Sequence, residues 1–197
     1  MSIAWIWLSG LAFAVIHSWL ATSRCKDTFY RRGVGHRAYR MAYSLLAIVL
    51  TALWFGFVPL LPDAPLYRME DGAKWLMTGL QLGGIGIVIM SFRAIDVSAF
   101  LGLSDTAEGT DPFVETGIYR YMRHPMYTGV MIALFASPSQ TVNSMNLFAV
   151  IALYFIIGAR FEERRMLAVH PAYAGYMKRV PAFIPFRALF PPGCGPQ

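Results

Sequence analysis

Long apolar runs dominate this sequence and limit what it can fold into. Residues 3–21, 41–61 and 75–92 contain no Asp, Glu, Lys or Arg. About 20 apolar residues in a helix cover the hydrocarbon core of a bilayer, because each residue rises ~1.5 Å. With 56% hydrophobic and 14% charged residues, the chain is too apolar for an ordinary soluble domain. We therefore predict an integral membrane protein, folded as an all-α, polytopic membrane helix bundle.

Two further apolar runs surround residues 137–144, an uncharged segment rich in turn-forming residues. They predict a helical hairpin. Its first arm, residues 125–137, is short for a complete crossing, so we expect it to be tilted or to enter from the membrane interface, or the hairpin turn to lie inside the far headgroup layer. The count is then about five transmembrane helices. Apolar residues three and four apart within residues 162–180 predict a C-terminal amphipathic helix or helix pair, with a break at Pro171.

The segments between the apolar runs differ in charge and length. Residues 24–40 are basic, and we expect a loop there that turns at Gly33 and Gly35. Residues 93–115 carry five acidic side chains and are long for a simple linker, so we expect a functional loop that forms part of the site. In the third apolar run, the glycines at 79, 83, 84 and 86 predict close helix packing in the centre of the bundle.

The basic residues predict how the chain is oriented. Of 17 Lys and Arg residues, only Arg68 and Lys74 fall on the side opposite to residues 24–40 in a five-helix arrangement, and the remaining 15 share one side. Since positive residues concentrate in cytoplasmic loops, we predict an outside N-terminus and a cytoplasmic C-terminus. The same bias explains the net charge of +6, so no nucleic-acid partner is expected. Cys25 and Cys194 lack metal-ligand spacing, and no metal site is expected.

A polar, cationic stretch, residues 117–129, leads directly into an apolar run. Pro125 has no N–H and disfavours a helical conformation at His124, so a helix is predicted to begin at Pro125. The unpaired N–H groups of its first turn, with Arg120, Arg123 and His124, would form an electropositive pocket for a carboxylate or another anionic group. The alternative is that these cations only extend to the lipid headgroups, as cations beside membrane helices commonly do.

A second group of residues favours the anion site. Arg123-His124-Pro125-Met126-Tyr127 is followed, after the hairpin, by Glu162-Glu163 and then by Tyr173, Tyr176, Arg179 and Pro181. This combination, here called the signature, resembles the isoprenylcysteine carboxyl methyltransferase and phospholipid methyltransferase superfamily of integral membrane enzymes. The N-terminal half is more similar to the bacterial methanethiol S-methyltransferase and NnrU-like branch, through His17-Ser18, residues 35–43 and residues 93–103.

The resemblance implies S-adenosyl-L-methionine (SAM) as the cofactor, and residues 1–197 as one domain with spans and loop in 1–115 and the cofactor-binding region in 116–185. SAM offers a carboxylate, an ammonium group and an adenosine, so its site needs a cation, a carboxylate and an apolar or aromatic wall. Arg123, His124 and the helix start at Pro125 would hold the carboxylate. The remaining cofactor-binding candidates are Tyr119, Tyr127, Glu162, Glu163, Tyr173 and Tyr176. Because one of two adjacent helical residues should point away, we expect Glu162 to contact the cofactor and Glu163 to serve structure or substrate.

The methyl acceptor implied by the closer branch is a small thiol such as methanethiol, or a lipophilic acceptor taken from the bilayer. A thiol must lose its proton, and His17, Asp96 and His124 are the candidate bases. An imidazole inside an apolar span is costly unless paired, which favours a role for His17 over a simple bond to a backbone carbonyl. Three alternatives stay open: a prenylcysteine carboxylate acceptor, a phospholipid amine acceptor, and a noncatalytic NnrU-like membrane protein. The bacterial branch implies the inner membrane.

Overall fold

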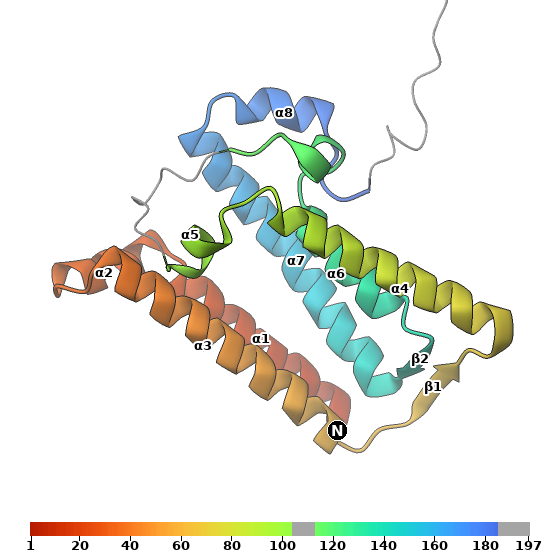
Figure 1. Cartoon of the computed structure of the whole chain (residues 1–197). Coiled ribbons are helices and arrows are strands. Elements are labelled where there is room, and N and C mark those ends of the chain that lie inside the picture. Colours follow the sequence, from red (N-terminus) through yellow and green to blue (C-terminus); the bar gives the residue numbers. More distant parts are fainter. Residues whose placement is uncertain (104–112, 185–197) are drawn as a thin grey trace, which may run out of the picture.

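The computed structural model describes residues 1–103 and 113–184, and it is built from helices with one short pair of strands (Figure 1). In chain order the elements are α1 (Ser2–Leu20), α2 (Ser23–Arg31), α3 (His36–Phe57), the 3-10 turn η1 (Val58–Leu60), β1 (Pro65–Arg68), α4 (Asp71–Phe92), α5 (Val97–Leu101), the 3-10 turn η2 (Gly117–Arg120), α6 (Pro125–Phe135), β2 (Ser139–Thr141), α7 (Val142–Val169) and α8 (Tyr173–Arg179). The predicted all-α membrane bundle is confirmed.

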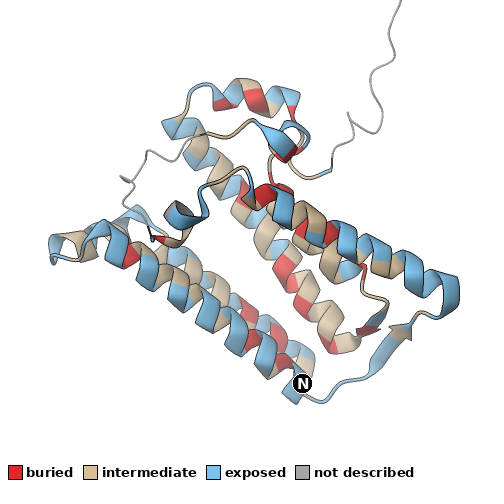
Figure 2. Cartoon of the chain, in the orientation of Figure 1, coloured by how far each residue is buried: buried red, intermediate tan, exposed pale blue. Residues whose placement is uncertain are grey.

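Four helices of the described residues are long and apolar enough to cross a membrane: α1, α3 continued by η1, α4 and α7. The fifth apolar helix, α6, has 11 residues, which gives about 16 Å of helix, roughly half the hydrocarbon thickness. The expectation of a short first hairpin arm is therefore confirmed. Figure 2 shows that the outward faces of α1, α3 and α4 are largely exposed, and large apolar side chains such as Leu45, Leu53 and Leu82 occupy them. These faces suit a lipid environment.

The buried core lies where α1, α3 and α7 meet. Ile6 of α1, Trp54 of α3 and Leu147, Val150 and Ile151 of α7 form one apolar cluster. Trp54 also donates from Nε1 to Ser9 Oγ at 3.0 Å, so its polar atom is satisfied inside the bundle. Helix α7 thus packs on α1 and η1 along one side and contacts α6 on the other.

Helices α4 and α6 approach closely through two glycines. A Cβ at Gly84 would lie 2.6 Å from both Ala133 N and Gly129 O, and a Cβ at Gly129 would lie 2.6 Å from Gly84 O. Gln81 Nε2 donates to the Ala133 carbonyl at 2.9 Å beside this contact. The predicted close packing is confirmed at Gly84, whereas a Cβ at Gly79, Gly83 or Gly86 would meet nothing within 4 Å. The predicted place of this helix in the centre of the bundle is wrong, because α4 packs mainly on α6 and its outer face is exposed.

One end of the bundle is closed by an antiparallel pairing of β1 with β2. The chain enters α4 from β1 and α7 from β2, so both crossings start from this end (Figure 1). The N-terminus lies here as well, because Ser2 Oγ donates to the Pro62 carbonyl at 2.7 Å. Buried Asn143 Nδ2 donates to the Pro62 carbonyl at 3.2 Å and links α7 to the same turn. The signature therefore lies at the opposite end, because α6 begins and α7 finishes there.

Two sequence predictions need correction. Residues 24–40 are not a loop: they form α2 and the first turn of α3, and Thr22 caps α2 by accepting from Cys25 N at 3.3 Å. The turn is confined to Gly33, at φ 86°, and its neighbours. The short helix α2 packs through Phe29 and Tyr30 against Tyr39, so apolar contacts hold it despite its basic composition. The other correction is at the C-terminal end. The predicted helix pair with a break at Pro171 is confirmed, since α7 ends at Val169 and α8 begins at Tyr173, but its first helix does not start at residue 162, because α7 runs without interruption from the apolar hairpin through Glu162-Glu163.

Candidate functional site

The beginning of α6 is joined to the end of the described chain. Helix α6 starts at Pro125 with His124 as its N-cap residue, as the sequence predicts. The backbone N–H groups of Arg123 and His124 donate to the carbonyls of Pro181 and Ala182, each at 2.9 Å. Thr128 Oγ1 reaches the Phe183 carbonyl at 3.2 Å. The start of α6 and residues 181–183, some 55 to 58 positions apart along the chain, are thus in direct contact.

A buried ion cluster joins α6, α7 and α8. Glu163 Oε1 accepts from Arg123 Nε at 2.8 Å and from His124 Nε2 at 2.9 Å, and it lies 2.7 Å from Arg123 Nη2. The Arg123 and Glu163 side chains are only 10% and 13% exposed. Arg123 Nη1 also donates to the carbonyls of Met177 and Val180 at the end of α8. Every nitrogen of the Arg123 guanidinium has a protein partner, so Arg123 links the start of α6 to α7 and to the end of α8.

Glu162 differs from Glu163 in its exposure. Its side chain is 41% exposed, it accepts from Tyr127 Oη at 3.2 Å, and it lies 3.8 Å from His124 Nδ1. Both carboxylates therefore reach His124, one at each ring nitrogen, and the expectation that one would point away is wrong. A glutamate side chain is long enough to offset the ~100° between adjacent helical residues. Glu162 keeps an accessible carboxylate, whereas Glu163 is enclosed.

Aromatic rings surround these charges. The His124 and Tyr127 rings stack with centroids 5.5 Å apart, and Tyr127 stacks on Phe155 at 4.6 Å. On α8, Tyr173 and Tyr176 are buried against Phe113, and Tyr176 Oη donates to the Tyr119 carbonyl at 2.6 Å. Burial raises the pKa of Tyr173 to about 12, and the nearby Glu163 carboxylate adds to this effect while Arg123 opposes it. Burial also raises the pKa of Tyr119, with a further contribution from Glu162. Both phenols are neutral hydrogen-bonding groups at physiological pH.

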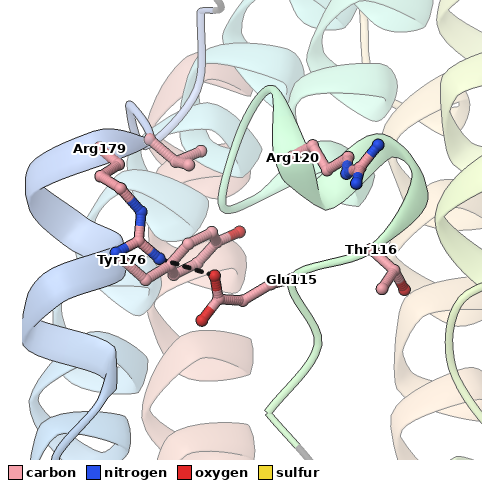
Figure 3. A pocket seen from close by; sticks show the side chains of 6 residues that line it. Glu115, Thr116, Arg120, Tyr176 and Arg179 are labelled. Atoms are coloured by element: carbon pink, nitrogen blue, oxygen red, sulfur yellow. Dashed lines mark hydrogen bonds and ion pairs between the residues drawn. The ribbon is translucent and has the colours of Figure 1, made fainter.

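A surface cavity of about 450 Å³ opens beside this cluster (Figure 3). Its lining consists of Glu115, Thr116, Arg120, Tyr176, Arg179 and Val180. Arg179 Nη2 donates to Glu115 Oε2 at 2.8 Å across one side, and Arg120 extends from η2 on the other. Arg120 belongs to the electropositive pocket expected from the sequence and Glu115 to the expected functional loop, whereas Arg179 was not selected as a site residue. The position of Arg179 within the signature was the available signal.

The remaining predicted site residues lie on other elements. His17 lies between α3 and α7, with its Nδ1 2.7 Å from Tyr154 Oη and its Nε2 2.8 Å from Tyr43 Oη. Sequence reasoning did not select Tyr43 or Tyr154, because only the packing of three helices brings them to the histidine. Asp96 is exposed and binds Ser98, accepting from its N at 2.9 Å and its Oγ at 2.6 Å, which caps the start of α5.

Part of the predicted functional loop falls within residues 104–112, outside the described residues. Among the residues that are described, no three His, Cys, Asp or Glu side chains are grouped to hold a metal ion.

The fold and the signature can be compared with known proteins. A family described as NnrU protein matches residues 5–174, which is most of the chain. The chain belongs to the NnrU protein family. Its membership agrees with the predicted similarity to the NnrU-like branch, and four apolar helices make this NnrU family member an integral membrane protein.

Curated relatives of this NnrU family member include several named methanethiol S-methyltransferase. Methanethiol S-methyltransferase 2 of Bradyrhizobium diazoefficiens is 27% identical over 88% of this chain and 69% of its own length. Methanethiol S-methyltransferase 1 of the same organism is 31% identical over 89% of this chain and 64% of its own length. The chain thus spans about two thirds of the length of these relatives.

A relative with another kind of name also matches. The chloroplastic 15-cis-zeta-carotene isomerase of Zea mays is 28% identical over 91% of this chain and 48% of its own length. No solved structure matches the chain significantly. Membership of the family therefore does not by itself assign an activity.

Proposed function

We propose that this protein is a membrane methyltransferase that binds SAM at the signature and transfers its methyl group to a small thiol. The observation that carries the proposal is the pair of carboxylates at the end of α7. Glu163 is enclosed with Arg123 and His124, while the adjacent Glu162 keeps an accessible carboxylate beside the same ring. The enclosed charges hold the end of α7 rigidly, and the accessible Glu162 carboxylate beside them suits a ligand that carries an ammonium group.

The residues present fit the chemical groups of SAM. Glu162 offers a carboxylate for the ammonium group or a ribose hydroxyl, and Arg120 and Arg179 bring positive charge to the adjacent cavity for the carboxylate. Tyr119, Tyr127, Tyr173 and Tyr176 supply aromatic surface around the cluster. Arg123 is fully engaged by Glu163 and two backbone carbonyls, which supports a positioning role more than direct contact with a ligand. His124 and Pro125 set the start of α6 against α7.

When bound, SAM supplies an electrophilic methyl group on a cationic sulfur. The chain's part is to hold the reacting groups in line and to exclude water, and neither task needs a metal. Glu162 lies about 30 Å along α7 from its start at Val142, close to the far boundary of a bilayer. A water-soluble cofactor and an apolar thiol dissolved in the bilayer would meet at this depth.

The names of the relatives support the thiol acceptor, since six of them are methanethiol S-methyltransferases. The proposal places the whole of residues 1–197 in one domain, with the signature facing the cytoplasm of a bacterial inner membrane. The other candidate is a noncatalytic NnrU-like membrane protein, which the family description favours. Cofactor binding separates the two.

Calorimetric titration of the purified protein with SAM tests the proposal. We expect binding by the native protein, and at least about tenfold weaker binding by Glu162→Gln, because a charge-assisted bond is lost. Glu70→Gln is the matched control, since Glu70 lies on the opposite end of the bundle and precedes α4. Labelled SAM is then presented with methanethiol, a prenylcysteine acid and phosphatidylethanolamine. Failure of the native protein to bind SAM would leave the noncatalytic candidate, and transfer to the acid or the lipid would replace the thiol.

A further inference from the structure

An imidazole between two phenol hydroxyls lies within the helix bundle, outside the buried ion cluster of Arg123, His124 and Glu163. Tyr154 Oη of α7 lies 2.7 Å from Nδ1 of His17 on α1, and Tyr43 Oη of α3 lies 2.8 Å from Nε2 and 3.2 Å from Nδ1. All three side chains are half-buried. Phe13 stacks on the His17 ring at 5.4 Å and closes one face. Three separate helices thus converge on one histidine, and both of its ring nitrogens have hydroxyl partners.

Holding a histidine in an apolar span is costly, and a leucine would pack there without polar partners. A neutral imidazole donates through one nitrogen and accepts through the other. If His17 Nδ1–H donates to the Tyr154 oxygen, then Nε2 is the acceptor and takes a hydrogen bond from the Tyr43 hydroxyl. His17 can then take up one proton from Tyr43, and both of its ring nitrogens still have hydroxyl partners.

The three-residue cluster is connected to the signature by a continuous row of rings. Tyr154 is followed by Phe155, with centroids 6.4 Å apart, and Phe155 stacks on Tyr127 at 4.6 Å. Tyr127 then stacks on His124 and donates to Glu162. Tyr43 and Tyr154 both lie within electrostatic range of the Tyr127 hydroxyl, and Tyr43 lies within range of Arg165, one turn beyond Glu162. The cluster therefore borders the apolar side of the proposed cofactor site.

We propose that Tyr43, His17 and Tyr154 form the acceptor end of the site, where a neutral thiol gives up its proton, with His17 as the base and Tyr43 as the relay. This inference rests on the proposed function. The thiol proton passes to the Tyr43 oxygen as the Tyr43 proton passes to His17 Nε2. The thiol sulfur forms a bond to the methyl carbon while the bond from that carbon to the donor sulfur breaks. His17 carries the proton until the neutral thioether leaves, and no other reactant is required.

Thiols of different acidity show whether His17 acts as a base or only packs in the bundle. We expect His17→Gln and Tyr43→Phe to lower turnover of an alkyl thiol about 10²–10⁴-fold at neutral pH. Turnover of 4-nitrothiophenol, which is already ionised, should fall less than about tenfold, because it needs no base. Phe155→Leu is the control for packing in the same row, and its losses should be equal for both thiols. Equal losses for both thiols in His17→Gln and Tyr43→Phe would overturn the proposal.

A second readout does not depend on turnover. Ring-nitrogen NMR signals of His17 in the SAM-free protein should shift when ethanethiol is added, while those of His36, at the exposed start of α3, should not. The His17 shift should be lost or reduced in Tyr43→Phe. Calorimetric SAM affinity should be kept in every variant, which also shows that each one is folded. If the native protein binds SAM but His17 does not respond to thiol, the acceptor site is wrong and the cofactor proposal stands. If it binds no SAM, the proposed function fails first.

Discussion

Arg123 is the residue on which the buried ion cluster depends most. Its guanidinium balances the enclosed carboxylate of Glu163 and binds two carbonyls at the end of α8. Removal of one partner from a buried ion pair leaves the other charge without compensation. We expect Arg123→Ala to lower the free energy of unfolding by about 3–5 kcal/mol, measured by chemical denaturation in detergent.

Arg164→Ala is the matched control for this prediction. Arg164 lies next to Glu163 on α7 but is exposed, so its loss should change the free energy of unfolding by less than about 0.5 kcal/mol. The double variant Arg123→Ala/Glu163→Ala should be closer to the native stability than Arg123→Ala alone, because no unpaired charge remains. An Arg123→Ala protein of native stability that binds SAM weakly would instead assign Arg123 to direct cofactor contact.

At the residue level, the predicted site residues of the signature lie together in the structure, whereas His17 and Asp96 have other partners, and the binding roles of all of them stay predictions. The motif placed Arg123, His124, Glu162 and Glu163 at one end of the bundle, and the structure brings them together. It gave no sign that Glu163 would neutralise Arg123, since spacing within one helix carries no information about a partner 40 residues away. The Tyr43 and Tyr154 hydroxyls around His17 were missed for the same reason.

At the scale of elements, the α4–α6 contact is tested by adding one methyl group. In Gly84→Ala the new Cβ would lie 2.6 Å from backbone atoms of α6, so the helices must separate. We expect a loss of about 1–3 kcal/mol in the free energy of unfolding. Gly83→Ala is the adjacent control, because a Cβ there meets nothing within 4 Å, and it should be neutral or slightly stabilising. Equal effects of the two substitutions would contradict the close contact.

The start of α7 is held by a carboxylate from another part of the chain. Asp63 Oδ1 accepts from Asn143 N at 3.0 Å and from Ala64 N at 2.8 Å. Desolvation opposes ionisation, but hydrogen bonds from the Thr141 side chain, Asn143 N and Ala64 N outweigh it and lower the pKa of Asp63. A lowered pKa in the folded state means that the stabilisation is present above the unfolded value of about 3.9 and is lost as the pH falls through the folded value.

The native protein should therefore be more stable than Asp63→Asn at pH 7, and this difference should shrink below about pH 4. Thermal unfolding of both proteins between pH 3 and pH 7 measures it. Glu70→Gln provides the control, because Glu70 is exposed and precedes α4, not α7. A stability difference that is independent of pH would show that the ionised carboxylate is not what holds α7.

Helix starts and lengths were predictable where a local signal exists, and tertiary pairings were not. Pro125 marks the start of α6, and the uncharged runs locate the four long helices, although α3, α4 and α7 extend beyond these runs into charged residues. The strands β1 and β2 have four and three residues and pair across more than 70 positions, so neither shows a pattern of its own. Helix α2 has no clear signal in the sequence, because its apolar face, Cys25, Phe29 and Tyr30, is small within a basic segment.

At the scale of the whole molecule, the two ends of the bundle differ in their basic residues. The β1–β2 end contains the N-terminus and two of the basic residues, Arg68 and Lys74. The other end contains the signature and the basic helix α2 (Figure 1). Helix α6 covers about half of the hydrocarbon core, and residues 136–141 continue it to β2, so the chain still passes from one end to the other. Basic residues concentrate on cytoplasmic loops, which would place the signature end in the cytoplasm.

Cysteine labelling from the two sides of the membrane tests this orientation. Cys25 and Cys194 are first replaced by serine, and single cysteines are then introduced by Ser139→Cys in β2 and Thr116→Cys beside η2. Both positions are exposed. In intact cells, a membrane-impermeant maleimide should label the cysteine at 139 and not the one at 116, and permeabilisation should expose the second.

Thr22→Cys, before α2, should behave as the cysteine at 116 does, because an end-to-end crossing by α1 separates it from the N-terminus. Labelling of 139 and 116 from the same side would mean that α6 and residues 136–141 do not complete a crossing, and the bundle would then have four spans in place of five.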